Sequence, residues 1–277
     1  QIKNPLGVMQ GRLLPKYNNR YQAHPVDCWQ DEFHLAEDLD LDCVEFILDY
    51  NDFQKNPLMT THGRQYIQTI TEQTGVSIHS ICADYFMEAP LHAENEQAAL
   101  QSVDVLIKLI KAAVELKIKD IVIPCVDGSS IQDEHLRDRF TEVLISIMPE
   151  AERYKVNLSL ETNLNPIQFH KLLADIDSPR VTVNYDIGNS ASLGYNYKDE
   201  LSAYGELISD IHIKDRVLGG GSVILGTGSA DISGFFKLLE NYNYQGPFIM
   251  QAYRDDEGVG IFKEQLYWLL EMFDQIL

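Results

Sequence analysis

Residues 156–161 read Val-Asn-Leu-Ser-Leu-Glu, and residues 181–186 read Val-Thr-Val-Asn-Tyr-Asp. Each is a short, largely apolar run that ends in a carboxylate, and we expect each to be a β-strand. Between them, Asn165-Pro166 opens a helix-like stretch, because Asn can accept from a free backbone N–H and Pro has no N–H to leave unpaired. The order strand, helix, strand is typical of a parallel βαβ unit.

The same unit recurs along the whole chain. Eight runs are expected to be strands: Leu6–Met9, Cys43–Leu48, Val76–Cys82, Asp120–Cys125, Val156–Glu161, Val181–Asp186, Asp210–Lys214 and Pro247–Gln251. Near-continuous apolar runs such as 121–123 are typical of strands buried on both faces. Eight βα units without a linker or a composition shift predict an α/β fold, a single (β/α)8 TIM barrel over residues 1–277. An open doubly wound sheet is the alternative, but it usually has fewer strands, and no Gly-x-Gly-x-x-Gly follows the first run.

The chain is strongly acidic, with 22 Lys and Arg against 42 Asp and Glu and a net charge of −20. Nucleic acids and anionic membranes would repel it, so neither is expected as a partner. No apolar run approaches the roughly 18 residues of a membrane span. The four cysteines form no Cys-x-x-Cys pair and are predicted to be free thiols. With no basic-then-apolar leader, these features indicate a cytoplasmic protein.

Polar side chains lie at the ends of the last four predicted strands: Glu161, Asp186, His212 and Gln251. Because the active sites of such barrels lie at the carboxyl ends of the strands, these side chains are expected to converge. Two carboxylates, an imidazole and an amide oxygen suit a divalent cation, Mn²⁺ above all, with Mg²⁺, Co²⁺ or Zn²⁺ as alternatives. Taken singly, each residue could equally end its strand at the solvent boundary.

Other polar residues near the predicted strand ends are weaker candidates for binding a substrate: Arg12, Glu45, His79, Asn163, Lys214 and Arg216. Arg12 could meet a phosphate or carboxylate, and His79 a hydroxyl, although a surface arginine and a core histidine are the ordinary alternatives. The glycine-rich segment 219–229 could cradle a phosphate with backbone N–H groups, or it could be a flexible connection.

Five stretches together carry a resemblance to a known family: Glu161-Thr162-Asn163, residues 186–189, residues 212–215, Gly226-Thr227-Gly228 with Asp231, and Gly246-Pro247. The chain resembles the sugar isomerases and epimerases of the xylose isomerase-like TIM barrels. It is most similar to the branch of L-xylulose-5-phosphate 3-epimerase and hexulose-6-phosphate isomerase. The resemblance implies a small sugar or sugar phosphate as substrate, and a homo-oligomeric assembly.

In that family, a Glu, an Asp, a His and a second Glu on strands 5 to 8 bind one divalent metal. The two Glu residues also exchange protons with a substrate carbon from opposite faces. The resemblance implies that Glu161, Asp186 and His212 are metal ligands and that Glu161 is catalytic. The chain departs from the family at Gln251, whose amide oxygen can coordinate a cation but cannot act as a base.

The expected function is therefore a metal-dependent isomerase or epimerase of a small carbohydrate or its phosphate. Glu161 would remove a proton beside a carbonyl and leave a metal-bound enediolate. Return of the proton on the same face gives an isomerase, whereas epimerisation needs a second group in place of Gln251. The acidic run 255–257 is one candidate for that group, although a solvated loop is its ordinary interpretation. A keto-polyol dehydratase and a non-catalytic sugar-binding barrel are the alternative functions.

Overall fold

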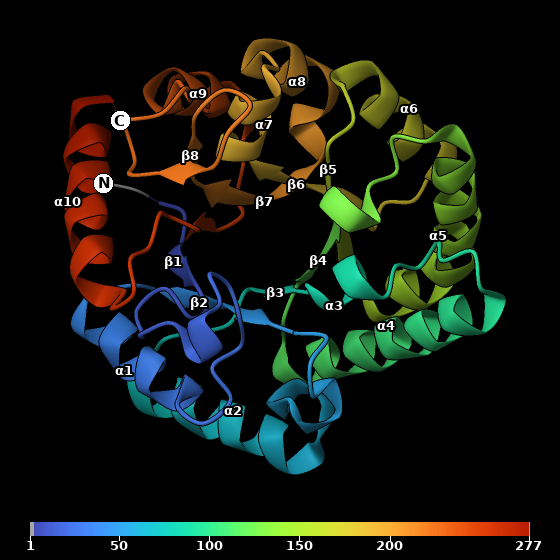
Figure 1. The fold of residues 1–277 in the computed structure, drawn as a ribbon, viewed down its shortest axis with the longest axis horizontal. Coiled ribbons are helices and arrows are strands. Elements are labelled where there is room, and N and C mark those ends of the chain that lie inside the picture. Colours follow the sequence, from blue (N-terminus) through green and yellow to red (C-terminus); the bar gives the residue numbers. More distant parts are fainter. Residues whose placement is uncertain (1–2, 277) are drawn as a thin grey trace.

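Eight parallel strands close into a barrel in the computed structural model, which describes residues 3–276 (Figure 1). Around the barrel the strands follow the order of the chain, and β1 closes the circle by pairing with both β2 and β10. This confirms the predicted (β/α)8 barrel. The barrel strands are β1 (Leu6–Met9), β2 (Cys43–Ile47), β3 (Ser80–Cys82), β4 (Asp120–Cys125), β5 (Asn157–Thr162), β6 (Val181–Asp186), β7 (Ile208–Ile213) and β10 (Phe248–Met250).

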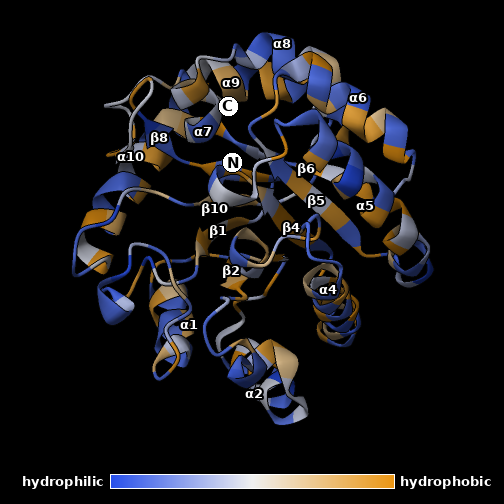
Figure 2. Ribbon diagram, turned by 45° about the vertical axis from the view of Figure 1, so that its right-hand side comes forward, coloured by the Kyte–Doolittle hydropathy of each residue, from blue (hydrophilic) through white to orange (hydrophobic). Residues whose placement is uncertain are grey.

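Helices surround the strands, and Figure 2 shows that they carry both apolar and polar residues. The predicted cap of α6 is present, since the Asn165 side chain accepts from the backbone N–H of Gln168 at 2.9 Å. Gly75 ends α2 with a φ of 74°, a backbone conformation that glycine adopts without strain. The helices are α1 (Trp29–Asp38), α2 (Thr61–Thr74), α3 (Tyr85–Glu88), α4 (Glu96–Leu116), α5 (Glu134–Tyr154), α6 (Pro166–Ile176), α7 (Ile187–Leu193), α8 (Tyr197–Tyr204), α9 (Ile232–Leu239) and α10 (Val259–Ile276).

The third strand is shorter than the sequence predicts. Residues 76–79 pair with β2 only through a single bridge between Ser77 and Cys43, and the strand begins at Ser80. The Ser80 hydroxyl donates to a glutamate inside the barrel, so Ser80 points inward. Because neighbouring strand residues point to opposite faces, His79 points outward, toward the helices.

A short antiparallel ribbon follows the seventh barrel strand and consists of β8 (Asp215–Arg216) and β9 (Ser222–Val223). It lies beside α7 and α9 at the same end of the barrel as the carboxyl end of β7 (Figure 1). Lys214 therefore stands between β7 and the ribbon, one residue past the strand that was predicted to contain it.

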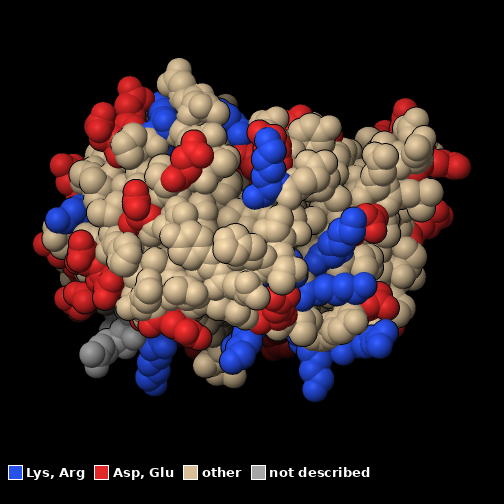
Figure 3. Space-filling model, turned by 90° about the horizontal axis from the view of Figure 1, so that it is seen from below, with Lys and Arg blue, Asp and Glu red and all other residues tan. Residues whose placement is uncertain are grey.

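The surface carries many acidic side chains. On the face shown in Figure 3, Asp and Glu gather on one side, and Lys and Arg are interspersed with them on the other. None of the helices within residues 3–276 is long and apolar enough to cross a membrane. Cys28, Cys43, Cys82 and Cys125 are free thiols, as predicted.

Candidate active site

The carboxyl ends of β5, β6 and β7 bring Glu161, Asp186 and His212 together. One ligand atom of each lies within 4.8 Å of the other two. His212 Nδ1 is 3.6 Å from Glu161 Oε2 and 4.0 Å from Asp186 Oδ2. Strand register explains the arrangement, since Asp186 pairs directly with His212 in the sheet. All three side chains are buried.

Glu45 fixes the orientation of the His212 ring. Its Oε1 lies 2.7 Å from His212 Nε2, and its Oε2 accepts from the Ser80 hydroxyl. With Nε2–H donated to Glu45, Nδ1 is the acceptor nitrogen; it lies 3.2 Å from Asn184 Nδ2 and faces the two other carboxylates. A histidine that donates one N–H to a carboxylate in this way is typical of metal sites. Glu45 is fully buried and lies beneath the site, so it is not on a surface that a substrate can touch.

Two asparagines hold the Glu161 carboxylate. Asn189 Nδ2 donates to Oε1 at 2.7 Å, and Asn184 Nδ2 donates to Oε2 at 3.0 Å. Burial, and next the charge of Asp186, raise the pKa of Glu161 to about 7. Neither asparagine was predicted as a site residue from the sequence. Asn184 stands two residues before Asp186 on one strand, so the period-two rule would have placed both on the same face.

The side chains of this cluster fit a divalent cation. Asp186 Oδ2 is buried and has no hydrogen-bond partner among the described residues, although Lys214 Nζ lies 3.6 Å away. A buried carboxylate oxygen without a donor is unfavourable unless a nearby positive charge compensates it. Two carboxylates and one imidazole nitrogen form an oxygen-rich donor set of the kind that Mn²⁺ and Mg²⁺ accept. Glu161, Asp186 and His212 could therefore hold such an ion.

Gln251 lies beside this cluster with its amide oriented by its neighbours. Its Oε1 accepts from Lys214 Nζ at 3.5 Å, and its Nε2 donates to Gln22 Oε1 at 2.8 Å. Gln22 belongs to the long connection between β1 and α1, from which Arg12 but not Gln22 was predicted as a site residue. The amide oxygen thus faces Lys214, and its coordination of a metal stays a prediction.

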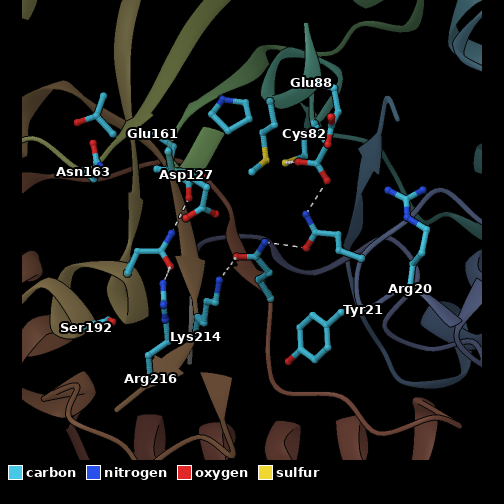
Figure 4. A pocket seen from close by; sticks show the side chains of 18 of the residues that line it. Arg20, Tyr21, Cys82, Glu88, Asp127, Glu161, Asn163, Ser192, Lys214 and Arg216 are labelled. Atoms are coloured by element: carbon cyan, nitrogen blue, oxygen red, sulfur yellow. Dashed lines mark hydrogen bonds between the residues drawn. The ribbon is translucent and has the colours of Figure 1, made fainter. Parts of the chain in front are cut away.

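A cavity of about 420 Å³ opens at this end of the barrel (Figure 4). Its size lies in the range of small-molecule sites. The predicted residues on its wall are Arg12, Glu161, Asn163, Lys214, Arg216 and Gln251. The structure therefore brings four of the six proposed substrate-binding residues, Arg12, Asn163, Lys214 and Arg216, to one cavity.

The other proposed contacts lie elsewhere. His79 lines a separate pocket on the outside of the barrel, with Lys117 and Lys119. His79 was predicted to lie on the third strand and to face the carboxyl end of the barrel, whereas that strand begins only at Ser80 and His79 precedes it. In the glycine-rich segment, the backbone N–H groups of Gly226 and Gly228 already donate to Asp215 Oδ2, at 3.0 and 2.8 Å. A side chain of the protein occupies the place that was predicted for a phosphate.

The acidic run after the eighth barrel strand is turned away from the cavity. Asp255 accepts from the backbone N–H of Gly258 at 2.7 Å, and Asp256 pairs with Lys16 at 2.8 Å. Asp255, Asp256 and Glu257 are not among the residues that line the cavity. They do not replace the missing second base.

The fold and this carboxylate–histidine cluster define a TIM barrel with a candidate metal centre at the carboxyl ends of its strands. The family model of the xylose isomerase-like TIM barrel matches residues 33–272, and the chain belongs to this family.

One curated relative is the L-ribulose-5-phosphate 3-epimerase UlaE of Salmonella paratyphi A. It is 26% identical over 259 residues, which cover 91% of this chain and 88% of the relative. Two solved structures show the same fold. The IolI protein with a bound zinc atom has a TM-score of 0.78 and 14% identity, with 99% of both chains covered. A xylose isomerase-like TIM barrel protein from Mycobacterium smegmatis in complex with magnesium has a TM-score of 0.73 and 16% identity, covering 99% of this chain and 98% of that one.

Proposed function

We propose that the chain is a divalent-metal-dependent epimerase or isomerase of a ketose phosphate. The observation that carries the proposal is the convergence of Glu161, Asp186 and His212 beside a cavity large enough for a small sugar, with Glu161 on the cavity wall. Membership of the xylose isomerase-like family supports it. The name of the Salmonella relative makes L-ribulose 5-phosphate the first substrate to test.

Glu161, Asp186 and His212 are the residues that would hold the cation. A divalent cation there would polarise a substrate carbonyl and make the adjoining C–H more acidic. Glu45 would keep His212 Nδ1 unprotonated and directed at the site, because Glu45 accepts the proton on Nε2.

Glu161 is the proposed base. Its carboxylate lines the cavity, and the amide groups of Asn184 and Asn189 hold both of its oxygens in place. A carboxylate whose two oxygens are both held in place suits a group that must take up a proton from the substrate and release it again. Removal of the proton beside the carbonyl leaves an enediolate of the sugar, and return of a proton completes the reaction.

Arg216 is the proposed contact for a phosphate. Its Nε donates to Gly220 O at 2.9 Å and its Nη1 to Asn189 Oδ1 at 2.8 Å. Within residues 3–276 it has no carboxylate at ion-pair distance, unlike Arg20, which pairs with Asp49 at 2.7 Å. An unneutralised guanidinium on a cavity wall can bind an anionic group through two parallel N–H donors.

Deuterium exchange tests the proposal. Chelated protein is reloaded with Mn²⁺ and incubated in D₂O with L-ribulose 5-phosphate, and then with a panel of other ketoses and ketose phosphates. We expect deuterium at a carbon beside the carbonyl of at least one of them, and no exchange in the chelated control. Loaded protein that exchanges no ketose in the panel would contradict the proposal.

A further inference from the structure

Because Gln251 stands where the family has its second glutamate, the residues described so far include none that can supply the second proton of an epimerisation. Inverting a carbon requires one group to remove a proton from one face and a second group to supply a proton to the other. An amide has no proton that it can give up at neutral pH, so Gln251 cannot be the second group. The following inference rests on the proposed function and identifies that second group.

Four carboxylates besides Glu161 line the cavity: Asp49, Asp84, Glu88 and Asp127. Asp49 is neutralised by Arg20, whose two terminal nitrogens contact its two oxygens at 2.7 and 2.9 Å. Glu88 and Asp127 are exposed at the mouth. Asp84 is half-buried and has no Lys or Arg at ion-pair distance within the described part of the chain.

Asp84 follows β3 by two residues and is held by two donors. Gln22 Nε2 donates to its Oδ2 at 2.7 Å, and the Cys82 thiol donates to its Oδ1 at 3.3 Å. Neither donor carries a charge. Burial raises the pKa of the Asp84 carboxyl above its ordinary value, which favours a protonated form that can act as an acid.

Hydrogen bonds connect Asp84 with the position of the missing glutamate. Gln22 accepts from Gln251 through its oxygen and donates to Asp84 through its nitrogen. The dashed lines in Figure 4 follow this chain from Lys214 through both glutamines to the carboxylate beside Cys82. Gln22 lies in the connection after β1, and β1 stands opposite β5 in the barrel order. Gln22 therefore ties Asp84 to position 251, where the family carries the second glutamate that acts from the face opposite the first.

We propose that Asp84 is the acid that protonates the substrate carbon on the face opposite Glu161. In one direction, the Glu161 carboxylate takes the proton, the C–H bond breaks and its electron pair passes into the enediolate. Protonated Asp84 then gives its proton to the same carbon from the other face, a new C–H bond forms, and Asp84 is left as a carboxylate. In the reverse direction Asp84 removes the proton and Glu161 returns it. Exchange with water resets both carboxyls between turnovers.

The test is the exchange pattern of Asp84→Asn in the Mn²⁺-loaded full chain, with each of the two epimers supplied separately in D₂O. The variant keeps one oxygen that can accept from Gln22 Nε2, and its NH₂ group then faces the Cys82 sulfur. We expect the epimer that Glu161 deprotonates to acquire deuterium without inversion, and the other epimer neither to exchange nor to convert. Epimer interconversion should fall by about 100-fold or more, the contribution of a positioned acid or base. Asp84→Glu, which keeps a carboxyl, should retain part of the interconversion.

Asp127→Asn is the matched control, since it removes an exposed carboxylate at the mouth of the same cavity. Both epimers should exchange and convert in it as in the unchanged protein. Interconversion by Asp84→Asn within about threefold of the unchanged protein would overturn the assignment. The assignment would also be overturned if Asp84→Asn had a normal melting temperature but lost exchange equally with both epimers, because Asp84 would then contribute to substrate binding and not to protonation of one face. If the unchanged protein exchanges no ketose, the proposed function itself fails, and the assignment of Asp84 fails with it.

Discussion

Replacing Glu45 by Gln should weaken Mn²⁺ binding while the barrel stays folded. Glu45 Oε1 accepts the Nε2–H of His212 at 2.7 Å, and both side chains are fully buried. The glutamine amide removes the negative charge beside the ring. If its NH₂ group turns toward Nε2, the ring proton moves to Nδ1, which is the atom that faces Glu161 and Asp186 and would bind the metal. Loss of such a partner lowers metal affinity by about 10- to 100-fold. That range corresponds to about 1.4 to 2.7 kcal/mol.

Titration calorimetry of chelated protein with Mn²⁺ measures this change. The matched control is Glu32→Gln. Glu32 is also fully buried, but it accepts from the backbone N–H groups of Gly11 and Leu13, at 2.6 and 3.0 Å, and makes no contact with His212. We expect Glu32→Gln to lower the melting temperature and to leave the dissociation constant for Mn²⁺ unchanged. Glu45 does not orient His212 for metal binding if Glu45→Gln binds Mn²⁺ within twofold of the unchanged protein, or if both variants weaken binding equally.

Three further outcomes are expected. Arg216→Gln should raise the KM for a ketose phosphate by about 10-fold or more and leave the KM for the unphosphorylated ketose nearly unchanged, since a hydrogen bond to a charged group is worth about 1.5 to 3 kcal/mol. Equal KM changes for both sugars would argue against a phosphate contact. Gln251→Glu should tighten Mn²⁺ binding in calorimetry, because it adds a negatively charged oxygen next to the carboxylate–histidine cluster. Unchanged or weaker binding would place residue 251 outside the ligand set. Burial raises the pKa of Glu32 to about 7, so the native state binds more protons than the unfolded state between about pH 4.5 and 7. The free energy of unfolding therefore decreases as the pH rises through that window. The melting temperature of the unchanged protein relative to Glu32→Gln should therefore fall from pH 5 to pH 8 in calorimetric scans, and a constant difference would contradict this pKa.

The barrel could be predicted because its signal is local. Apolar runs such as 120–125 and 181–186 match the observed strands at both ends, and the Asn165 cap of α6 follows from two adjacent residues. The predicted strand boundaries were wrong where the apolar pattern was weaker, as in residues 76–79, which make only one bridge to β2. That failure misplaced His79, because a side chain cannot be assigned to a face before its strand is in register.

The residues that converge at the carboxyl ends of consecutive strands could also be derived from the chain. Parallel strands in a closed barrel end at one rim, so Glu161, Asp186 and His212 had to lie near one another once the barrel was accepted. The sequence did not indicate what supports them. Glu45 was placed among the substrate contacts, although the structure buries it against His212.

The sequence by itself determined a barrel and the rim on which its chemistry lies, because the period of burial and the helix caps are set by residues a few positions apart. Only the tertiary structure decided the roles of Glu45, Gln22 and Asp84. His212 meets Glu45 across 167 residues of chain, and Gln251 meets Gln22 across 229. Such contacts depend on how the barrel closes and on the path of the β1–α1 connection over its mouth, which no local pattern encodes.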